Sequence, residues 1–230
     1  MAVSIKSARE IELMREAGKR LAHVHQELEA MIAPGISTWE IDAKGEKLIR
    51  DCGCIPNFLH YNGYPASICV SVNDEVVHGI PRKDRYLKEG DIVSLDAGLI
   101  YKGYHSDAAR THAVGKVSTE AQKLMDVTKQ SFFEGIKMAK EGQHLHDISR
   151  AIEEYVTPYG YGIVRDLVGH GIGTALHEDP QIPNYAQKRR GVRLQAGMTL
   201  AIEPMINAGT WQVRFLRDGW TVVTKDGSLS

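Results

Sequence analysis

The run Gly90-Asp91-Ile92-Val93-Ser94-Leu95-Asp96 decides the fold, because it returns later in the chain as Gly197-Met198-Thr199-Leu200-Ala201-Ile202-Glu203. Each copy is an apolar run that begins at a glycine and ends at a carboxylate, and the offset between them is 197 − 90 = 107. The same offset relates further identical pairs, namely Met31 and Met138, Gly35 and Gly142, Ile41 and Ile148, Glu46 and Glu153, Gly53 and Gly160, and Leu87 and Leu194. This pattern indicates an internal duplication, with pseudo-repeats over about 7–115 and 118–230. Because each half brings one acid to an equivalent strand end, the duplication suggests a metal site.

The size and charge of the chain favour one soluble domain. Its 230 residues, 43% of them hydrophobic, are enough to bury one substantial core, and nothing between the two halves resembles a linker. We therefore expect a single catalytic domain over residues 1–230. A net charge of −1 gives no argument for nucleic-acid specificity or for binding to a membrane surface.

Three cysteines cannot all pair, and so sparse a content is typical of a reducing compartment. The N-terminus lacks the apolar core of a signal peptide, and no apolar run approaches the roughly 20 residues that span a bilayer. These features predict a cytoplasmic protein, and without an evident interaction segment a monomer is expected.

Hydrophobic periodicity predicts an α+β fold. Helices are expected over 7–31, 38–53, 119–140 and 146–156, in two matching pairs. Strands are expected over 67–72, 91–95, 104–114, 198–202, 211–216 and 220–224. Helix pairs that alternate with antiparallel strands imply helices covering one face of a curved antiparallel sheet.

Two aspartates mark the first half of the candidate site. Asp96 and Asp107 are 11 residues apart, and a hairpin that turns near Lys102-Gly103 would bring their carboxylates face to face. Two neighbouring aspartates repel each other unless they share a cation or a proton. The alternative is a pair of aspartates that cap turns.

A glycine-rich motif marks the second half. In Gly169-His170-Gly171-Ile172-Gly173 the glycines would let the backbone bend and leave the imidazole accessible. His177 follows seven residues later, and Glu203 ends the repeated run. The zincin motif HExxH is excluded, because Gln181 stands where its second histidine should be and Pro180 would break the helix.

Carboxylates with one histidine form an oxygen-rich ligand set, which suits two divalent ions such as Mn, Fe, Co or Zn. His78 precedes a Gly/Pro loop and is a third candidate. We interpret four further histidines as surface or packing residues: His23, His25, His144 and His146. The roles of His60, His105 and His112 stay open, with structural roles favoured.

Together these motifs resemble the type I methionine aminopeptidases of the pita-bread metallopeptidase superfamily. The resemblance runs from about Ser4 to the last residue and rests on five stretches: Tyr61-Asn62-Gly63-Tyr64-Pro65, residues 71–81, Asp96 with Asp107, residues 169–173, and Ile202-Glu203-Pro204-Met205. It implies the pita-bread fold, with its pseudo-twofold αβ halves. It also implies metal-dependent removal of the N-terminal methionine from nascent proteins and peptides whose second residue is small, with a transient ribosome contact.

The resemblance assigns roles to individual residues. The metal ligands would be Asp96, Asp107, His170 and Glu203, with Asp107 bridging two ions. His78 would contact the substrate backbone, His177 would stabilise the scissile carbonyl, and Glu203 would relay the proton of the attacking water. The methionine pocket would be lined by Phe58, Tyr61, Tyr64, Cys69 and Trp220, and ordinary core packing is the alternative for this apolar set.

The family also has a fifth ligand, a bridging glutamate on a later strand, and the sequence ends at Ser230. Within the repeat, Glu203 likewise lacks a following strand with an acid in the place of Asp107. We therefore expect a chain without this strand to bind metal weakly and to be poorly active.

Three other functions remain open. A prolidase or aminopeptidase P of the same fold would cleave beside proline. A catalytically impaired binding module would recognise peptides without metal. A mononuclear iron oxygenase built on His170, His177 and one carboxylate would leave the other acids unexplained.

Overall fold

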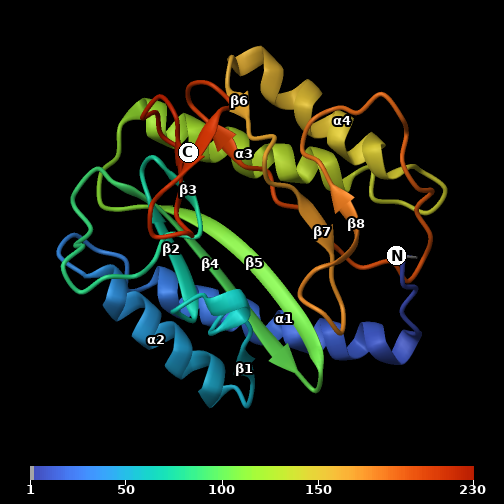
Figure 1. Ribbon diagram of the computed structural model, residues 1–230, viewed down its shortest axis with the longest axis horizontal. Coiled ribbons are helices and arrows are strands. Elements are labelled where there is room, and N and C mark those ends of the chain that lie inside the picture. Colours follow the sequence, from blue (N-terminus) through green and yellow to red (C-terminus); the bar gives the residue numbers. More distant parts are fainter. Residues whose placement is uncertain (1–2) are drawn as a thin grey trace.

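The computed structural model describes residues 3–230 (Figure 1). Its helices form two matching pairs, as predicted: α1 (Ala8–Glu29) with α2 (Thr38–Asp51), and α3 (Thr119–Ile136) with α4 (Leu145–Val156). Short 3-10 turns, η1 (Tyr61–Gly63) and η2 (Thr157–Tyr159), follow the pairs. Helix α4 begins 145 − 38 = 107 residues after α2, the offset of the sequence repeat. The description of the chain as one catalytic domain with two pseudo-repeats stays a prediction.

Capping residues fix where the helices begin. Ser7 accepts a hydrogen bond from the backbone N–H of Glu10, and the Glu10 carboxylate accepts one from the Ser7 N–H, which completes a capping box. Ser37 and Glu40 do the same for α2. Helix α3 ends four residues before the predicted position, because the N–H groups of Met138 and Ala139 bond three residues back in tighter turns.

The strands are short and every pairing is antiparallel. Their bounds are β1 (Ile55–Pro56), β2 (Ile68–Val72), β3 (Glu75–Val77), β4 (Ile92–Tyr101), β5 (Tyr104–Ala113), β6 (Gly162–Ile163), β7 (Gly169–Gly171), β8 (Glu178–Ile182), β9 (Leu200–Ala201), β10 (Ile206–Asn207), β11 (Val213–Phe215) and β12 (Val222–Thr224). Hydrogen bonds join them into four groups, β1-β4-β2 with β5 on β4, β10-β6, β11-β12-β3 and β8-β7-β9. The expected single curved sheet is therefore divided into four smaller hydrogen-bonded sheets.

The hairpin of β4 and β5 turns at the predicted place. Lys102 and Gly103 have φ values of 50° and 86°, which suit a two-residue hairpin turn. The resulting register places Asp96 opposite Ala109 and Asp107 opposite Gly98. The two aspartates are therefore diagonal neighbours on one face of the hairpin, and their side chains interact as the predicted hairpin requires.

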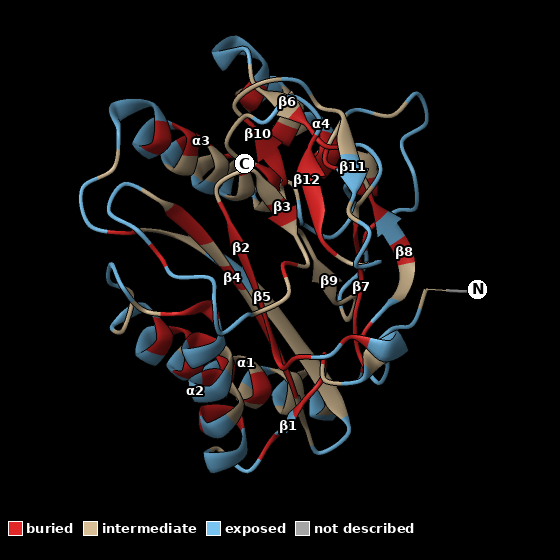
Figure 2. Cartoon of the chain, turned by 60° about the vertical axis from the view of Figure 1, so that its left-hand side comes forward, coloured by how far each residue is buried: buried red, intermediate tan, exposed pale blue. Residues whose placement is uncertain are grey.

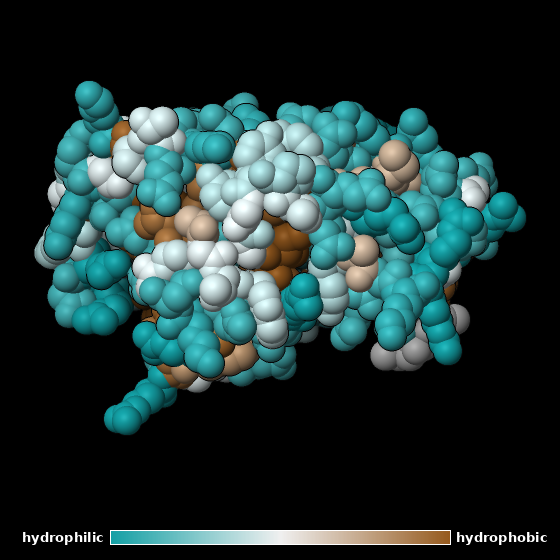
Figure 3. All heavy atoms as spheres, turned by 90° about the horizontal axis from the view of Figure 1, so that it is seen from above, coloured by the Kyte–Doolittle hydropathy of each residue, from teal (hydrophilic) through white to brown (hydrophobic). Residues whose placement is uncertain are grey.

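Each helix pair covers its own core. The larger cluster packs α1 and α2 against β2 and β4, and the second packs α3 and α4 against residues such as Ile163, Ile182 and Ile206. Figure 2 shows buried residues on the strands and on the inner faces of the helices. In the view of Figure 3 the outer face is mostly hydrophilic, and hydrophobic atoms show in small areas between polar side chains. Within residues 3–230, no helix is both long and apolar enough to cross a membrane.

Candidate active site

His170 lies on β7 and is buried, with 7% of its surface exposed. Its Nδ1 lies 2.8 Å from the carbonyl oxygen of Gly171, and because a carbonyl can only accept, Nδ1 carries the proton that it donates. In a neutral ring the other nitrogen, Nε2, then has a lone pair. This nitrogen lies 3.2 Å from Oε1 of Glu203 and 3.9 Å from Oδ2 of Asp107. The fold thus presents the ligand nitrogen of His170 to two of the predicted carboxylates.

The carboxylates come from both halves of the chain. Asp96 and Asp107 belong to β4 and β5, and Glu203 follows β9, which pairs with β7. The Asp107 side chain is 11% exposed, and Oε1 of Glu203 is buried without a hydrogen-bond partner although that side chain as a whole is 37% exposed. A buried carboxylate oxygen without a donor is costly unless a cation or a proton meets it.

The acids also perturb one another. Burial raises the pKa of Asp96, and the neighbouring Asp107 and Glu203 raise it further. Burial and Glu203 raise the pKa of Asp107 to about 7, although His170 acts in the opposite direction. Burial would lower the pKa of His170, but Glu203 and Asp107 outweigh burial and raise it.

These observations fit a divalent cation. A cation would neutralise the carboxylates that repel each other and would bind the free lone pairs of Oε1 of Glu203. Nε2 of His170 would complete this oxygen-rich set of metal ligands. Within residues 3–230, however, no three such side chains already stand in ligand geometry. The predicted ligands therefore lie as contacting pairs, and they would have to move slightly closer together to hold an ion.

His78 directly follows β3 and adopts a left-handed backbone conformation with φ of 59°. Such a conformation is unusual for a residue with a side chain and is found at functional sites. The His78 ring packs edge-on against Trp220, at 6.4 Å between centroids. Burial lowers the pKa of His78 while Glu203 opposes this shift, so the imidazole is mostly neutral at pH 7.

His177 lies beside His170, with ring centroids 4.2 Å apart. Its Nδ1 forms a 2.8 Å hydrogen bond with the Tyr61 hydroxyl, which leaves Nε2 as the nitrogen that can reach a substrate. Partial burial of the ring and the nearby His170 lower the pKa of His177. The residue as a whole remains exposed, as a group that meets a substrate must be.

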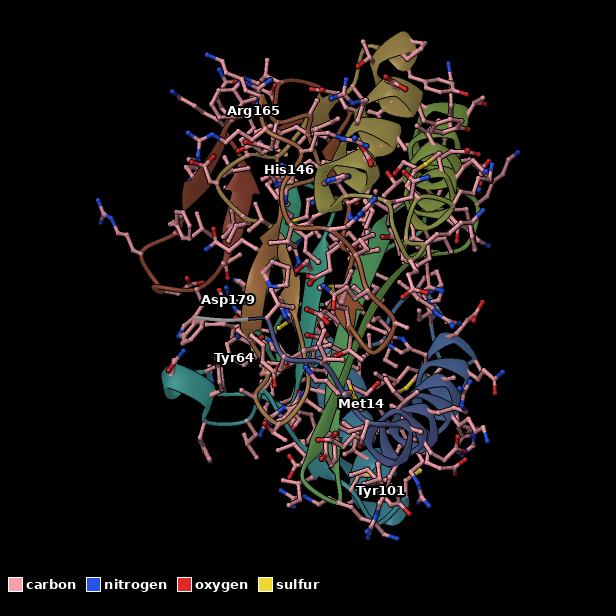
Figure 4. All side chains as sticks on the ribbon, turned by 90° about the vertical axis from the view of Figure 1, so that its right-hand side faces the viewer. Met14, Tyr64, Tyr101, His146, Arg165 and Asp179 are labelled. Atoms are coloured by element: carbon pink, nitrogen blue, oxygen red, sulfur yellow. The ribbon has the colours of Figure 1, made fainter. Side chains whose placement is uncertain are left out.

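The five residues predicted to line a pocket lie in one apolar cluster. Phe58, Tyr64 and Cys69 are buried members, and Tyr61 and Trp220 pack against them. Figure 4 labels Tyr64 and Met14, which also packs against this cluster. Cys69 on β2 is the register partner of Asp96 on β4, so the apolar cluster adjoins the carboxylates.

Sequence reasoning missed five further members of this cluster: Met14, Ala66, Ile80, Ile172 and Leu176. Ile172 stands inside the glycine-rich motif, and its apolar side chain between two glycines was the available signal. The others come from a helix and from loops, where sequence gives no indication of their neighbours. His105, for which the sequence favours a structural role, lies close enough to lower the pKa of His177.

Two cavities lie near these elements. The smaller, about 270 Å³, adjoins His177 and is lined by residues 4–6, Glu10 and residues 174–179 except Leu176. The larger, about 430 Å³, lies between the end of α3 and residues 194–202. It contains none of the predicted site residues, so the chemistry of the histidines and carboxylates locates the site better than cavity size.

The carboxylate cluster should make the metal-free protein less stable as the pH rises from about 4 to about 7. In this window the unfolded chain has already lost the Asp107 proton, which the folded protein keeps up to about pH 7. Protonation therefore stabilises the folded state fully at low pH, and this contribution, on the order of 4 kcal/mol, disappears as the pH rises through 7. Denaturant unfolding of chelator-treated protein between pH 5 and 8 measures the slope. A slope that Asp107→Asn leaves unchanged would contradict this origin.

The model of the family described as "Metallopeptidase family M24" matches residues 12–225 of the chain. This match spans nearly the whole chain and includes every predicted ligand. The chain belongs to metallopeptidase family M24.

Individual relatives define the group within the family. The chain is 53% identical over 228 residues to a methionine aminopeptidase of Clostridium acetobutylicum, covering 99% of this chain and 91% of the relative. A methionine aminopeptidase of Escherichia coli is 42% identical and is covered over 88% of its length. The crystal structure of a methionine aminopeptidase from Thermotoga maritima superposes with a TM-score of 0.97 at 46% identity, covering 99% of this chain and 92% of that one. These relatives place the chain among the methionine aminopeptidases. The superposition confirms the predicted α+β pita-bread fold.

The rival peptidases share the fold at a greater distance. A prolidase from Pyrococcus furiosus superposes with a TM-score of 0.74 at 23% identity, and the chain covers 64% of its length. This likeness shows a common architecture and carries no argument for cleavage beside proline.

Proposed function

We propose that the chain removes the N-terminal methionine from peptides and nascent proteins whose second residue is small. The observation that carries the proposal is the register of β2 and β4, which sets Cys69 of the apolar cluster beside Asp96 of the carboxylates. An apolar cluster of Phe, Tyr, Cys and Trp suits an unbranched thioether, and it ends at the predicted metal centre. His78 and His177 lie at the same junction.

In this proposal Asp96, Asp107, His170 and Glu203 would hold two divalent ions, Mn, Fe, Co or Zn. When bound, such ions lower the pKa of a water molecule and polarise a carbonyl. The protein would supply the remaining chemistry. Oε1 of Glu203 is buried without a donor and can accept the proton of the attacking water.

The two neutral histidines would bind the reacting peptide. Nε2 of His177 can donate to the scissile carbonyl oxygen and to the oxyanion that forms from it, because Tyr61 holds Nδ1. His78, held against Trp220, would contact the substrate backbone. The free α-amine of the substrate would approach one of the metal ions, which would restrict cleavage to the first peptide bond.

Turnover of Met-Ala-Ser against an Ala-Pro-Ser peptide of the same length, with each of the four metals, tests this function. We expect release of methionine and little cleavage beside proline. Preferred cleavage of the proline peptide would identify the prolidase-like alternative. Peptide binding without cleavage under any metal would identify the impaired binding module.

The cellular setting is part of the proposal. We propose a cytoplasmic monomer that contacts the ribosome transiently, where N-termini emerge. Arg214, Phe215 and Arg217 are exposed on and after β11, a few residues before Trp220 of the pocket cluster. Exposed arginines can bind phosphates, so salt-sensitive co-sedimentation with ribosomes is the measurement that checks this contact.

A further inference from the structure

A buried ion pair joins the N-terminal segment to the loop that carries His177. Nζ of Lys6 lies 2.5 Å from Oε2 of Glu178, and the two side chains are 6% and 15% exposed. The partners are 172 residues apart in sequence, and Glu178 directly follows His177. Pulling the two segments apart would leave both buried charges uncompensated, so this contact constrains the position of both segments.

Gly173 makes room for this pair. A Cβ atom at Gly173 would lie 2.5 Å from Oε1 of Glu178 and 2.6 Å from Cε of Lys6. The last glycine of the motif 169–173 therefore serves the ion pair, since any side chain there would push Lys6 and Glu178 apart. The sequence had suggested that this glycine leaves His170 accessible, and the structure gives it a different neighbour.

Both ends of the pair are anchored. The backbone N–H of Lys6 donates to the carbonyl of Gly197 at 2.8 Å, which fixes the N-terminal segment. On the other side, Glu178 accepts hydrogen bonds from the Ser4 hydroxyl at 2.8 Å and from the backbone N–H of Ala175 at 3.2 Å. Burial would raise the pKa of Glu178, but Lys6, Ser4 and Ala175 together lower it, so the carboxylate is charged at neutral pH.

Packing alone holds the loop weakly on this side. Leu176 is buried in the apolar cluster, but Thr174, Ala175 and His177 are exposed. The cavity of about 270 Å³ lies beside the ion pair and is lined by the loop, by residues 4–6 and by Glu10. Figure 1 shows the N-terminal end of the chain beside β7 and β8, and Figure 4 labels Asp179, which follows Glu178 at the start of β8. The backbone N–H of His105 donates to the Gly173 carbonyl at 2.8 Å and the Tyr61 hydroxyl bonds to His177, so Lys6 and Glu178 supply the fixing contact on the side of the cavity.

We propose that the ion pair of Lys6 and Glu178 positions the 173–179 loop, so that the His177 imidazole meets the scissile carbonyl. Lys6 and Glu178 are positioning residues, because they act through His177 and touch no reacting atom. The inference rests on the proposed function and adds the N-terminal segment to the machinery of the site.

The main test is the double variant Lys6→Met/Glu178→Gln, which leaves no unpaired buried charge and therefore keeps the protein folded. We expect kcat for Met-Ala-Ser to fall about tenfold or more with KM within about twofold, because a small misplacement of a catalytic group has a large effect on the rate. In a His177→Ala background the same two substitutions should cause no further loss, since residues that act as a unit are not additive. A pair with a merely structural role would lower kcat equally in both backgrounds.

The matched control is Lys19→Met, which removes an exposed lysine paired with Glu16 on α1 and should leave kcat unchanged. Bound metal and melting temperature are measured for every variant. Wild-type kcat in the double variant, or equal losses with and without His177, would overturn the positioning role while leaving the proposed function intact. Absence of wild-type turnover with all four metals would instead refute the proposed function.

Discussion

Replacing Asp107 with asparagine is expected to lower turnover of Met-Ala-Ser by about a thousandfold or more, and at the same time to stabilise the metal-free protein at pH 8. The loss follows because a ligand that bridges two ions contributes several kcal/mol to the reaction, and about 1.4 kcal/mol corresponds to a tenfold change in rate. The gain follows because Asp107, with its pKa raised to about 7 by burial and by the charge of Glu203, is charged at pH 8 in a buried setting. An amide of the same shape removes that repulsion.

Metal content by elemental analysis, peptide turnover and denaturant unfolding of the metal-free protein together measure this prediction. Asp84→Asn is the matched control, because Asp84 is an exposed partner of Arg82 on the surface and should change none of the three quantities. Asp107→Asn protein that keeps its metal and its turnover would show that Asp107 is no ligand. A loss of stability in the metal-free variant would show that the carboxylates do not repel each other as inferred.

The substitution His177→Ala is expected to lower kcat about 100- to 1000-fold while leaving bound metal unchanged. A single donor to a developing oxyanion contributes an effect of this size, and His177 is the exposed neutral imidazole beside His170. Metal should stay bound because the predicted ligands lie on other segments. Tyr61→Phe, which removes the hydrogen bond to Nδ1 without emptying the apolar cluster, should have a smaller effect in the same direction.

Steady-state kinetics and metal analysis of these variants measure the prediction, with His23→Ala as control because His23 is an exposed histidine on α1. Unchanged kcat would remove His177 from the mechanism. Loss of metal in His177→Ala would instead make His177 part of the metal centre, which the separation of roles between His170 and His177 does not allow.

Much of the fold could be predicted because its signals are local. Ser7 with Glu10 and Ser37 with Glu40 mark helix starts through contacts three residues apart, and the structure has both capping boxes. The hairpin turn at Lys102-Gly103 was equally readable, because few residues accept two successive positive φ angles. That two-residue turn also fixes the register, because it pairs Tyr101 with Tyr104 and therefore Asp96 with Ala109.

The site is divided between sequence and tertiary structure. Residue type and repeat symmetry by themselves determined which side chains are the candidates for the site, namely Asp96, Asp107, His170, His177 and Glu203, and the 107-residue offset relates Asp96 to Glu203. Tertiary structure alone decided that Nε2 of His170 faces Glu203 and Asp107, that Cys69 lies beside Asp96, and that Gly173 accommodates Lys6 against Glu178. The physical reason is range: caps, turns and repeats are set by neighbours along the chain, whereas burial, charge repulsion and ion pairing depend on atoms that meet only after distant segments have packed.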